Sequence, residues 1–396
     1  MEKEDIIEKS DCEFAHPMIP IRKKDGSIRP CVDFRQINSY TKEDPFPMPS
    51  FDNIIETLKD SKFLTTLDLC KGFWQIEMEE NSKKLTSFVT QDGQWQFKRM
   101  PFGLKNATAT LNRIMNKILV NHHSYARSFV DDVIIFSETF EEHLEHVNAI
   151  LNELNNANLT IKLEKCKFAY NEVEYLGYKI GNGEYWPIEE KCNKINECSK
   201  PNTMKQLRRF LGMVNFYSRF IKNLSEEEYY LTELLKQRER KVIWNINAEK
   251  SFEKLKKIIN NKLKLAIPTE KGQYVLYTDA SDIGISGVLN QVQNGKEVPI
   301  LCISKKLSLA QRKYAVVEKE CLAIVWAINR LQKYLLGNHF VIRSDHKALQ
   351  WLLHNHTGLS RLGRWALSLQ GYSFTVIHIT GTLNNAADYF SRNFIE

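Results

Sequence analysis

The sequence predicts an α+β domain, followed by a basic and mostly helical segment and by a mixed α/β domain. Strand-like and helix-like apolar patterns alternate over the first part of the chain, positive charge gathers in the middle, and five strand-like runs follow. At 396 residues the chain is too long for one ordinary hydrophobic core. We therefore expect two or three domains, with boundaries near residues 185 and 271.

The α+β prediction rests on the order of patterns between residues 62 and 180. Three runs rich in apolar and β-branched residues are typical of strands: 62–69, 127–137 and 174–180. Apolar residues recur at helical spacing over 111–119 and from Phe140 through Leu144 to Leu154, which gives each segment one apolar face. We expect a sheet with helices on one face, preceded by hairpins and turns.

Positive charge is concentrated in the middle of the chain. Between Lys191 and Lys271 there are 19 Lys and Arg against 9 Glu, a balance of +10 in a chain whose net charge is +7. Aromatic residues are interleaved with cations here: Phe210, Phe216, Tyr217 and Phe220 with Arg208, Arg209, Arg219 and Lys222. A solvated helical face is one interpretation. The other, favoured by the aromatics, is a surface that contacts the phosphate backbone of a nucleic acid.

The mixed α/β domain is predicted from the last third of the chain. Five runs are typical of strands: 273–281, 284–291, 298–306, 339–346 and 372–379. A helix over 315–335 follows the third run, short helices near 346–353 and 360–370 follow the fourth, and a terminal helix starts near Asn384. Helices inserted after the third and fourth strands indicate a self-contained domain.

Composition excludes several classes of protein. No apolar run approaches the ~18 residues of a membrane span, so we expect no membrane partner. The eight cysteines are scattered without a CxxC pair, which predicts a reduced, intracellular protein with no structural zinc site. His143 and His146 lie close together, but no cysteine pair accompanies them, and we interpret both as solvent-facing helix residues.

The run Arg127–Ser137 contains two adjacent aspartates, Asp131 and Asp132, among apolar residues. One interpretation is a turn whose carboxylates stay in water, because two charges that leave water together need a cation or donors. The other is a metal site, completed by Asp68 at the end of the run 62–69. Adjacent strand residues project to opposite faces, so Asp132 needs a turn to take part. We therefore rank Asp131 and Asp68 above it.

Four further acids are spread over the last domain. Asp279 and Asp345 end strands, Glu320 lies on a helix, and Asp388 opens the terminal helix. Each of them alone is typical of a surface position. Four acids on different elements of one five-stranded domain favour a second metal site, because two-metal chemistry needs carboxylates that converge.

Five segments occur in the order and spacing of reverse transcriptases from long-terminal-repeat (LTR) retroelements, and the chain most resembles the gypsy-like retrotransposons. They are RKKDGSIRPCVDFRQIN, TTLDLCKGFWQI, FKRMPFGLKNATAT, FVDDVIIFSETFEEHLEHV and EVEYLGYKI. The segments YTDAS, VEKECLAIVWA, SDHKAL and NNAADYFSR resemble the ribonuclease H fused to these enzymes. The resemblance implies an α+β right-hand polymerase with fingers, palm and thumb or connection, followed by an α/β ribonuclease H-like domain with a five-stranded mixed sheet.

The resemblance gives roles to residues of the first domain. Asp68, Asp131 and Asp132 would hold the catalytic metals. Phe73 stands where the family keeps an aromatic steric gate that excludes a ribose 2′-OH, so the enzyme would take dNTPs. A core aromatic is the alternative for Phe73.

The resemblance also implies contacts with the nucleotide and the primer. Arg29 and Lys23 lie where cations clamp the triphosphate of a dNTP, and a guanidinium suits that contact. By residue type alone both are exposed hairpin charges. Leu176 and Gly177 fall at the primer grip, where a glycine lets the backbone approach the primer strand. Gly177 is also compatible with a bulge.

In the last domain, Asp279, Glu320, Asp345 and Asp388 would bind the metals that hydrolyse the RNA strand of an RNA–DNA hybrid. Such a protein recognises the shape of the hybrid and its 2′-OH groups. His378 stands where related domains keep a His or Tyr near the metals. A structural strand residue is the alternative for His378.

The implied enzyme is an RNA- and DNA-directed DNA polymerase with ribonuclease H activity, which replicates an LTR retroelement. Its cofactor would be Mg²⁺, two ions per active site, with Mn²⁺ as an alternative. Its partners would be an RNA template, a DNA primer, an RNA–DNA hybrid and dNTPs. Residues 1–185 would form the fingers and palm, 186–271 the thumb and connection, and 272–396 the ribonuclease H-like domain.

Other hypotheses stay open at this point. A domesticated or inactive element would only bind nucleic acid through its basic segment. A non-LTR or intron-type reverse transcriptase fits less well, because of the ribonuclease H-like domain and the segment MPFGLKNA. The sequence shows neither an aspartic-protease motif nor an integrase zinc motif, so we expect a processed piece or a fragment of an element.

Overall fold

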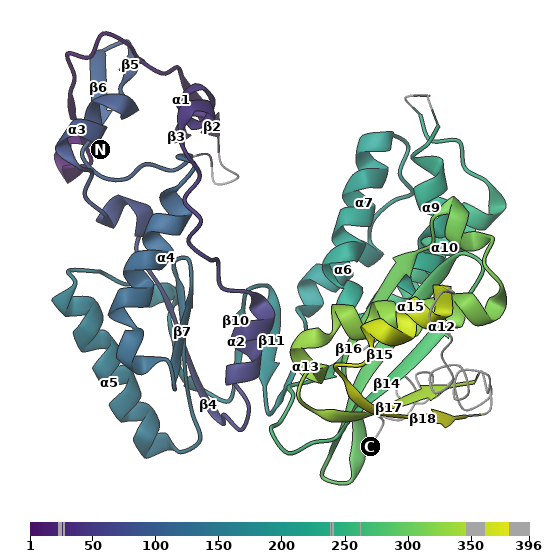
Figure 1. Cartoon of the computed structure of the whole chain (residues 1–396). Coiled ribbons are helices and arrows are strands. Elements are labelled where there is room, and N and C mark those ends of the chain that lie inside the picture. Colours follow the sequence, from purple (N-terminus) through teal and green to yellow (C-terminus); the bar gives the residue numbers. More distant parts are fainter. Residues whose placement is uncertain are drawn as a thin grey trace. The chain divides into compact units, whose positions relative to one another are not determined.

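The computed structural model describes residues 1–22, 26, 28–237, 239, 241–261, 263–345 and 361–379 (Figure 1). The chain divides into two compact units, Met1–Leu176 and Gly177–Glu396. Within the described residues, no helix is long and apolar enough to cross a membrane.

The centre of the first unit is a four-stranded antiparallel sheet in the order β7-β8-β4-β9. Its strands are β4 (Phe63–Asp68), β7 (Ala126–Phe129), β8 (Asp132–Ser137) and β9 (Lys167–Tyr170). Helices α4 (Ala107–Ile118) and α5 (Phe140–Asn156) pack against it (Figure 1). The strands and helices predicted between residues 62 and 156 are confirmed.

Alternation along β4 and β8 decides which side chains face the helices. Leu67 and Val133 are register partners, each at most 1% exposed, and they share a hydrophobic cluster with α4 and α5. The next pair in the register is Asp68 and Asp132. This pair therefore projects to the face that α4 and α5 do not cover.

The buried face of α5 differs from the predicted one. Its buried residues are His143, Ile150 and Leu154, whereas Leu144 is 55% exposed. His143 is fully buried, and its Nε2 and Nδ1 atoms lie 2.7 Å from Thr65 Oγ1 and 2.8 Å from Ser137 Oγ. The interpretation of His143 as solvent-facing is wrong, because two sheet hydroxyls satisfy both ring nitrogens.

The second histidine of that pair is half-buried. The ring of His146 stacks on Tyr125, with centroids 3.7 Å apart, and its Nδ1 lies 2.8 Å from Ser137 Oγ. Its stacked position on the first unit's sheet differs from the solvent-facing one that we predicted.

His143 should make the stability of the protein pH-dependent. Burial lowers the pKa of its imidazole to about 4, and the charge of His146 adds to the effect. In the unfolded chain the pKa is about 6.5, so protonation favours unfolding. Stability is complete above pH 6.5 and falls as the pH drops towards 4, by about 3 kcal/mol. Urea denaturation at several pH values measures this loss.

The variant His143→Gln should lose less stability over the same pH range, because it carries no titrating group. The control is His339→Gln, at an exposed position in the second unit. Identical pH profiles for the wild type and His143→Gln would rule out this role of His143.

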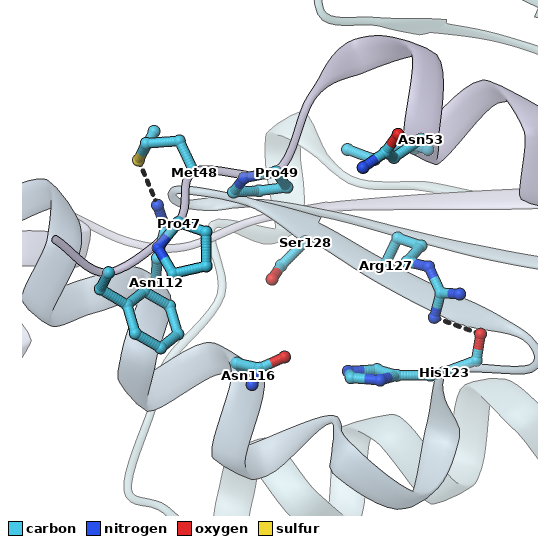
Figure 2. Close-up of a pocket in the computed structure, with 11 residues that line it drawn as sticks. Pro47, Met48, Pro49, Asn53, Asn112, Asn116, His123, Arg127 and Ser128 are labelled. Carbon is cyan, nitrogen blue, oxygen red and sulfur yellow. Dashed lines mark hydrogen bonds between the residues drawn. The ribbon is translucent and has the colours of Figure 1, made fainter. Parts of the chain in front are cut away.

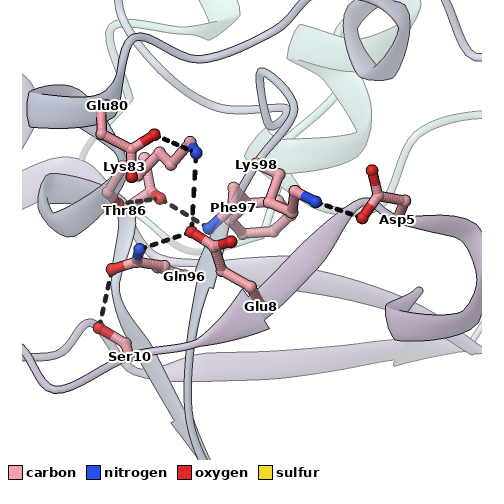
Figure 3. A network of polar contacts seen from close by, with 9 residues as sticks. All are labelled: Asp5, Glu8, Ser10, Glu80, Lys83, Thr86, Gln96, Phe97 and Lys98. Carbon is pink, nitrogen blue, oxygen red and sulfur yellow. Dashed lines mark hydrogen bonds and ion pairs between the residues drawn. The ribbon is translucent and has the colours of Figure 1, made fainter.

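The N-terminal part of the first unit contains a three-stranded sheet in the order β1-β6-β5 and the hairpin β2-β3. The strands are β1 (Ile7–Lys9), β2 (Met18–Arg22), β3 (Ile28–Val32), β5 (Phe88–Thr90) and β6 (Gly93–Phe97). Polar contacts tie β1 to its surroundings (Figure 3). Glu8 accepts a hydrogen bond from its register partner Gln96 at 2.8 Å and lies 3.8 Å from Lys83 Nζ.

The remaining elements of the first unit are short. They are α1 (Arg35–Tyr40), α2 (Phe51–Thr57), α3 (Glu80–Lys83) and β10 (Glu172–Tyr175). Ser50 caps α2 by accepting a hydrogen bond from the backbone of Asn53. The segment between α1 and α2 contains Pro45, Pro47 and Pro49 and forms no helix or strand.

The second unit begins with a small antiparallel sheet and a group of helices. The strands are β11 (Tyr178–Gly181), β12 (Glu184–Pro187) and β13 (Leu265–Ala266). The helices are α6 (Glu189–Asn196), α7 (Met204–Phe216), α8 (Leu224–Glu227), α9 (Tyr229–Leu234) and α10 (Ile246–Asn260). Thr203 and Gln206 form a capping box at the start of α7.

The aromatics of this helical segment mostly belong to its core. Phe210, Tyr217 and Phe220 are at most 5% exposed, whereas Phe216 is 46% exposed. Arg208 and Arg209 lie on the exposed side of α7. The pattern that favoured an interleaved aromatic and basic surface is therefore mainly an amphipathic helix, in which Arg208, Arg209 and one aromatic, Phe216, face water.

The rest of the second unit is a five-stranded mixed sheet in the order β16-β15-β14-β17-β18. Its strands are β14 (Tyr274–Ala280), β15 (Gly284–Gln293), β16 (Lys296–Lys306), β17 (His339–Ser344) and β18 (Ser373–His378). The pairs β14-β15 and β15-β16 are antiparallel, and β14-β17 and β17-β18 are parallel. All five predicted strands are confirmed.

Helices pack against this sheet, as Figure 1 shows for α12 (Val316–Arg330). The others in the described part of the domain are α11 (Leu309–Arg312), α13 (Gln332–Leu335) and α15 (Arg361–Ser368). The helices predicted near 346–353 and from Asn384 lie outside the described residues.

Candidate active sites

The first candidate site lies at the end of β4 and β8. Asp68 and Asp132 are register partners, and Asp131 occupies the tight connection between β7 and β8. The backbone N–H of Leu69 donates to the carbonyl oxygen of Asp131 at 3.1 Å. The structure therefore brings together the three aspartates that the sequence selected.

Asp132 is the aspartate whose pKa is raised, first by burial and then by repulsion from the other two carboxylates. Burial raises its pKa to about 6, and the charges of Asp131 and Asp68 add to the rise. Lys165 opposes this effect, because its Nζ lies 2.7 Å from Asp68 Oδ2. Bound divalent cations would supply the compensation that one exposed lysine gives only in part.

Lys165 belongs to this site, although no pattern in the sequence indicated it. It follows β8 by almost thirty positions, and long-range contacts bring it back to Asp68: β9 pairs with β4, and the N–H of Lys162 donates to the carbonyl oxygen of Asp68 at 2.8 Å. Its side chain is more than half exposed, so a metal ion that binds Asp68 can displace the ammonium group into water.

The register corrects the reason for ranking Asp132 below Asp131. We expected Asp132 to point away from Asp68, but Asp132 and not Asp131 is the register partner of Asp68. Side chains of register partners project to the same face of a sheet. The ranking itself stays a prediction.

The turn that carries Asp131 is held in an unusual conformation. Val130 has a φ of +58°, which is costly for a β-branched residue. Its N–H donates to Asn112 Oδ1 at 3.1 Å, and Asn112, on α4, is only 3% exposed. The sequence did not indicate Asn112, because the contact joins a helix to a turn 18 positions away.

Asn112 also lines a pocket of about 450 Å³ between the segment Phe46–Ile54, α4 and β7 (Figure 2). Figure 2 shows its side chain beside Met48, whose sulfur accepts a hydrogen bond from Asn112 Nδ2. None of the three aspartates lines this pocket. Asn112 thus both lines the pocket and bonds to the turn that carries Asp131.

Asn112→Ala should lower the rate of nucleotide incorporation about tenfold, because one buried hydrogen bond to the turn is worth about 1–1.5 kcal/mol. Single-turnover incorporation of one nucleotide measures the change. The matched control is Asn116→Ala, which lines the same pocket but lies on the exposed side of α4. Equal rates for the two variants would show that the turn does not depend on Asn112.

Phe73 lies next to the same turn. A Cβ added to its neighbour Gly72 would lie 3.1 Å from the Cβ of Asp131, so the backbone passes close to the aspartate. Phe73 is half-buried, packs on the hydrophobic cluster of the sheet and meets Phe102 edge-on at 5.1 Å. Phe73 therefore has both the core contacts of a structural aromatic and the position beside the turn that the predicted steric gate requires.

Four more residues were predicted for the first site: Arg29, Lys23, Leu176 and Gly177. Arg29 belongs to β3 and pairs with Ile21, but only its backbone is described, and Lys23 lies outside the described residues. Leu176 and Gly177 have φ values of +48° and +89°. Two successive positive φ values form a tight reversal rather than a bulge.

The second candidate site lies in the five-stranded sheet. Asp279 is in β14, and Asp345 follows β17 directly. These strands are parallel neighbours, so their carboxyl ends meet at one edge of the sheet. Glu320 is on α12, which packs against the sheet.

Glu320 is the most perturbed acid of this site. It is 5% exposed, and its burial raises its pKa to about 8, with further contributions from Asp279 and Asp345. A hydrogen bond from the backbone of Ala280 compensates in part. Its Oε2 atom is buried and has no hydrogen-bond partner among the described residues. An unsatisfied, buried carboxylate oxygen that faces two other acids fits a divalent cation.

His378 lies beside Asp345. It ends β18, pairs with Ser344, and its Nε2 lies 3.0 Å from the carbonyl oxygen of Asp345. A neutral imidazole that donates this bond holds the backbone of Asp345. Asp388 lies outside the described residues.

Neither the three aspartates of the first site nor the three described acids of the second site form a closed set of ligands around one point. Among the described residues, no three His, Cys, Asp or Glu side chains stand close enough to enclose one metal ion. The carboxylates still fit a divalent metal, because they converge, repel one another and leave Oε2 of Glu320 unsatisfied.

Two family models match the chain. The family described as "Reverse transcriptase (RNA-dependent DNA polymerase)" matches residues 21–180, which include Asp68, Asp131 and Asp132. The family described as "RNase H-like domain found in reverse transcriptase" matches residues 269–372, which include Asp279, Glu320 and Asp345. Both families generally depend on divalent metals.

Curated relatives match along almost the whole chain. The Retrovirus-related Pol polyprotein from transposon 297 of Drosophila melanogaster is 38% identical over 399 residues, covering 99% of this chain and 37% of the relative. That from transposon gypsy of the same organism is 33% identical, covering 98% and 39%. The Transposon Tf2-3 polyprotein of Schizosaccharomyces pombe is 32% identical, covering 98% and 30%. The chain thus spans 30 to 39% of the length of these relatives.

Solved structures share the fold. The foamy viral protease-reverse transcriptase dRH in complex with double-stranded DNA has a TM-score of 0.85 at 24% identity, covering 96% of this chain and 67% of that one. The foamy viral protease-reverse transcriptase in complex with an RNA/DNA hybrid has a TM-score of 0.82 at 24% identity, covering 96% and 52%. The predicted α+β polymerase fold with a five-stranded ribonuclease H-like domain is confirmed. The chain belongs to the reverse transcriptase and ribonuclease H region of the Pol polyproteins of LTR retrotransposons.

Proposed function

We propose that this chain synthesises DNA on RNA and DNA templates and hydrolyses the RNA strand of RNA–DNA hybrids, in the replication of an LTR retroelement. The observation that carries the proposal is the grouping of Asp68, Asp131 and Asp132 at one sheet end, within the part of the chain that matches a reverse transcriptase family. The acids at the edge of the five-stranded sheet provide the second activity.

In the polymerase site, Asp68, Asp131 and Asp132 would hold two Mg²⁺ ions, with Mn²⁺ as an alternative. Such ions lower the pKa of a primer 3′-OH and neutralise the leaving pyrophosphate. Asn112 holds the turn beneath Asp131, so the carboxylates keep their places when substrate arrives.

Other residues of the first domain would bind the substrates. Phe73, beside the catalytic turn, would exclude a ribose 2′-OH and so select dNTPs. Arg29 and Lys23 would clamp the triphosphate, and the reversal at Leu176 and Gly177 would approach the DNA primer. A Cβ at Gly177 would lie 3.0 Å from Lys191 Nζ and from Phe216 Cζ, so this position has little room for a side chain.

In the ribonuclease H site, Asp279, Glu320, Asp345 and Asp388 would hold two Mg²⁺ ions, which supply an activated water and stabilise the leaving 3′ oxygen. His378 contacts the backbone that carries Asp345 and so would keep that acid in place. The two solved neighbours are complexes with double-stranded DNA and with an RNA/DNA hybrid, which supports nucleic-acid partners.

The proposed domains are fingers and palm over 1–185, thumb and connection over 186–271, and ribonuclease H over 272–396. Exposed cations of the middle segment, such as Arg208 and Arg209 on α7, would follow the phosphate backbone of the duplex. The proposed thumb and connection and the proposed ribonuclease H domain belong to one compact unit, Gly177–Glu396.

Primer extension tests the proposal directly. A labelled DNA primer on an RNA template, with dNTPs and Mg²⁺, should be extended to full length, and EDTA should abolish the reaction. A protein that only binds nucleic acid would retain the duplex without extending the primer in either Mg²⁺ or Mn²⁺. That result would overturn the proposed polymerase function.

A further inference from the structure

The helical segment of the second unit reaches the ribonuclease H site. The short helix α8 lies against β15 and β16, where the N–H of Ser225 donates to Ser304 Oγ at 3.1 Å. The packing is close, because a Cβ added to Gly284 in β15 would lie 2.6 Å from Ser225 Oγ. The segment that contains α8 therefore packs tightly against β15 and β16.

Asn223, which precedes α8, makes two contacts at this edge. Its Nδ2 donates to Asp279 Oδ2 at 3.3 Å, and its Oδ1 accepts a hydrogen bond from Ser286 Oγ at 2.5 Å. Ser286 is the register partner of Asp279, so both bonds go to the same face of neighbouring strands. The hydroxyl of Ser286 orients the amide with its donor towards Asp279.

The backbone holds Asn223 in this position. Its φ is +53°, in the left-handed region that asparagine tolerates better than most residues. Its carbonyl oxygen accepts hydrogen bonds from the N–H groups of Glu226 and Glu227. Both the side chain and the backbone of Asn223 are therefore held in place. A fixed amide can hold the carboxylate of Asp279 in one orientation.

We propose that Asn223 is a positioning residue of the ribonuclease H site, whose amide holds Oδ2 of Asp279 and leaves Oδ1 for a divalent cation. This inference rests on the proposed ribonuclease H function. It extends the site to a residue before position 269, where the match to the ribonuclease H-like family begins. The helical segment then belongs to the nuclease site as well as linking it to the first domain.

The charge around Asp279 makes a donor at position 223 important. Glu226, from the same segment, interacts unfavourably with Asp279 while it accepts a hydrogen bond from Ser281. Asp279 also repels the ionised form of Glu320. The amide of Asn223 differs from these acids, because it donates a hydrogen bond to Asp279 and adds no negative charge.

The test measures cleavage of a labelled RNA–DNA hybrid by the full chain as a function of Mg²⁺ concentration. Asn223→Ala should raise the Mg²⁺ concentration for half-maximal cleavage about tenfold, with a smaller effect on the maximal rate. Asn223→Asp should raise it further, because it replaces the donor by a charge. Ser286→Ala should move it in the same direction, by less, because the amide loses its orientation.

The matched control is Asn215→Ala. Asn215 lies in the same helical segment and donates to Leu211 and Glu228, away from the acids of the site. Its Mg²⁺ dependence should equal that of the wild type. Thermal melting of each variant identifies a loss of folding, which would lower the maximal rate instead of shifting the Mg²⁺ dependence.

The outcomes separate this inference from the proposed function. If the wild type cleaves the hybrid and both Asn223→Ala and Ser286→Ala keep its Mg²⁺ dependence, the positioning role is overturned. Faster cleavage by Asn223→Ala at low Mg²⁺ would also overturn the positioning role. It would show that the hydrogen bond from Asn223 competes with the metal ion for Asp279. If the wild type cleaves no hybrid, the proposed ribonuclease H function fails.

Discussion

Asp131→Asn and Asp132→Asn are each expected to lower primer extension at least about 10²-fold, because metal-bound carboxylates contribute several kcal/mol to the transition state. Hybrid cleavage should change by less than about a factor of two, since its acids lie in the other compact unit. The measurement is single-nucleotide incorporation at saturating Mg²⁺. Asp92→Asn, at an exposed turn in the same unit, is the matched control and should behave as the wild type.

The same pair of variants tests the ranking within the site. The sequence argument ranks Asp131 with Asp68 above Asp132, so a clearly smaller loss in Asp132→Asn would support it. The register makes Asp132 the partner of Asp68, and burial makes it the acid that gains most from a bound cation. Equal losses would refute the ranking. If both variants retained activity, the proposed metal site at these aspartates would be refuted.

Glu320→Gln is expected to abolish hybrid cleavage and yet to stabilise the metal-free protein. The pKa of Glu320 is raised by burial to about 8, whereas an unfolded glutamate titrates near 4.3. The folded state therefore keeps a proton that the unfolded state loses. Stability is complete below about pH 4.3 and is lost as the pH rises through 8, and a neutral glutamine avoids this loss.

Thermal melting in EDTA at pH 5, 7 and 9 measures this effect. The melting temperature of Glu320→Gln should exceed that of the wild type by an amount that grows with pH. Added Mg²⁺ should reduce this difference, because it stabilises only the wild type. Glu318→Gln is the control on the same helix, because Glu318 is paired with Arg361. A constant difference across the pH range would show that the buried carboxylate is not the cause.

Elements with strong periodicity could be predicted from the sequence. The strands of both sheets, and the helices that pack on them, have apolar residues that recur regularly, and each predicted strand of the last domain has its counterpart in β14 to β18. Asp68, Asp279 and Asp345 could be selected for the same reason. Each interrupts or ends an apolar run, where a charge is costly without a partner.

Contacts between distant segments could not be predicted in this way. His143 is buried because Thr65 and Ser137 face it from two strands, which helical spacing does not reveal. Asn112 and Asn223 act through backbone and amide contacts made only in the folded chain. Asparagine is common at surfaces and turns, so its residue type gave no signal.

One reaction tests the central claim that a single chain carries two separate carboxylate sites. A DNA primer and its RNA template, each with its own label, are incubated with dNTPs and Mg²⁺, and both strands are resolved over time. We predict that the wild type extends the primer and cuts the template, that Asp131→Asn only cuts a preformed hybrid, and that Glu320→Gln only extends. Loss of both activities in either variant, with its fold intact, would contradict the account.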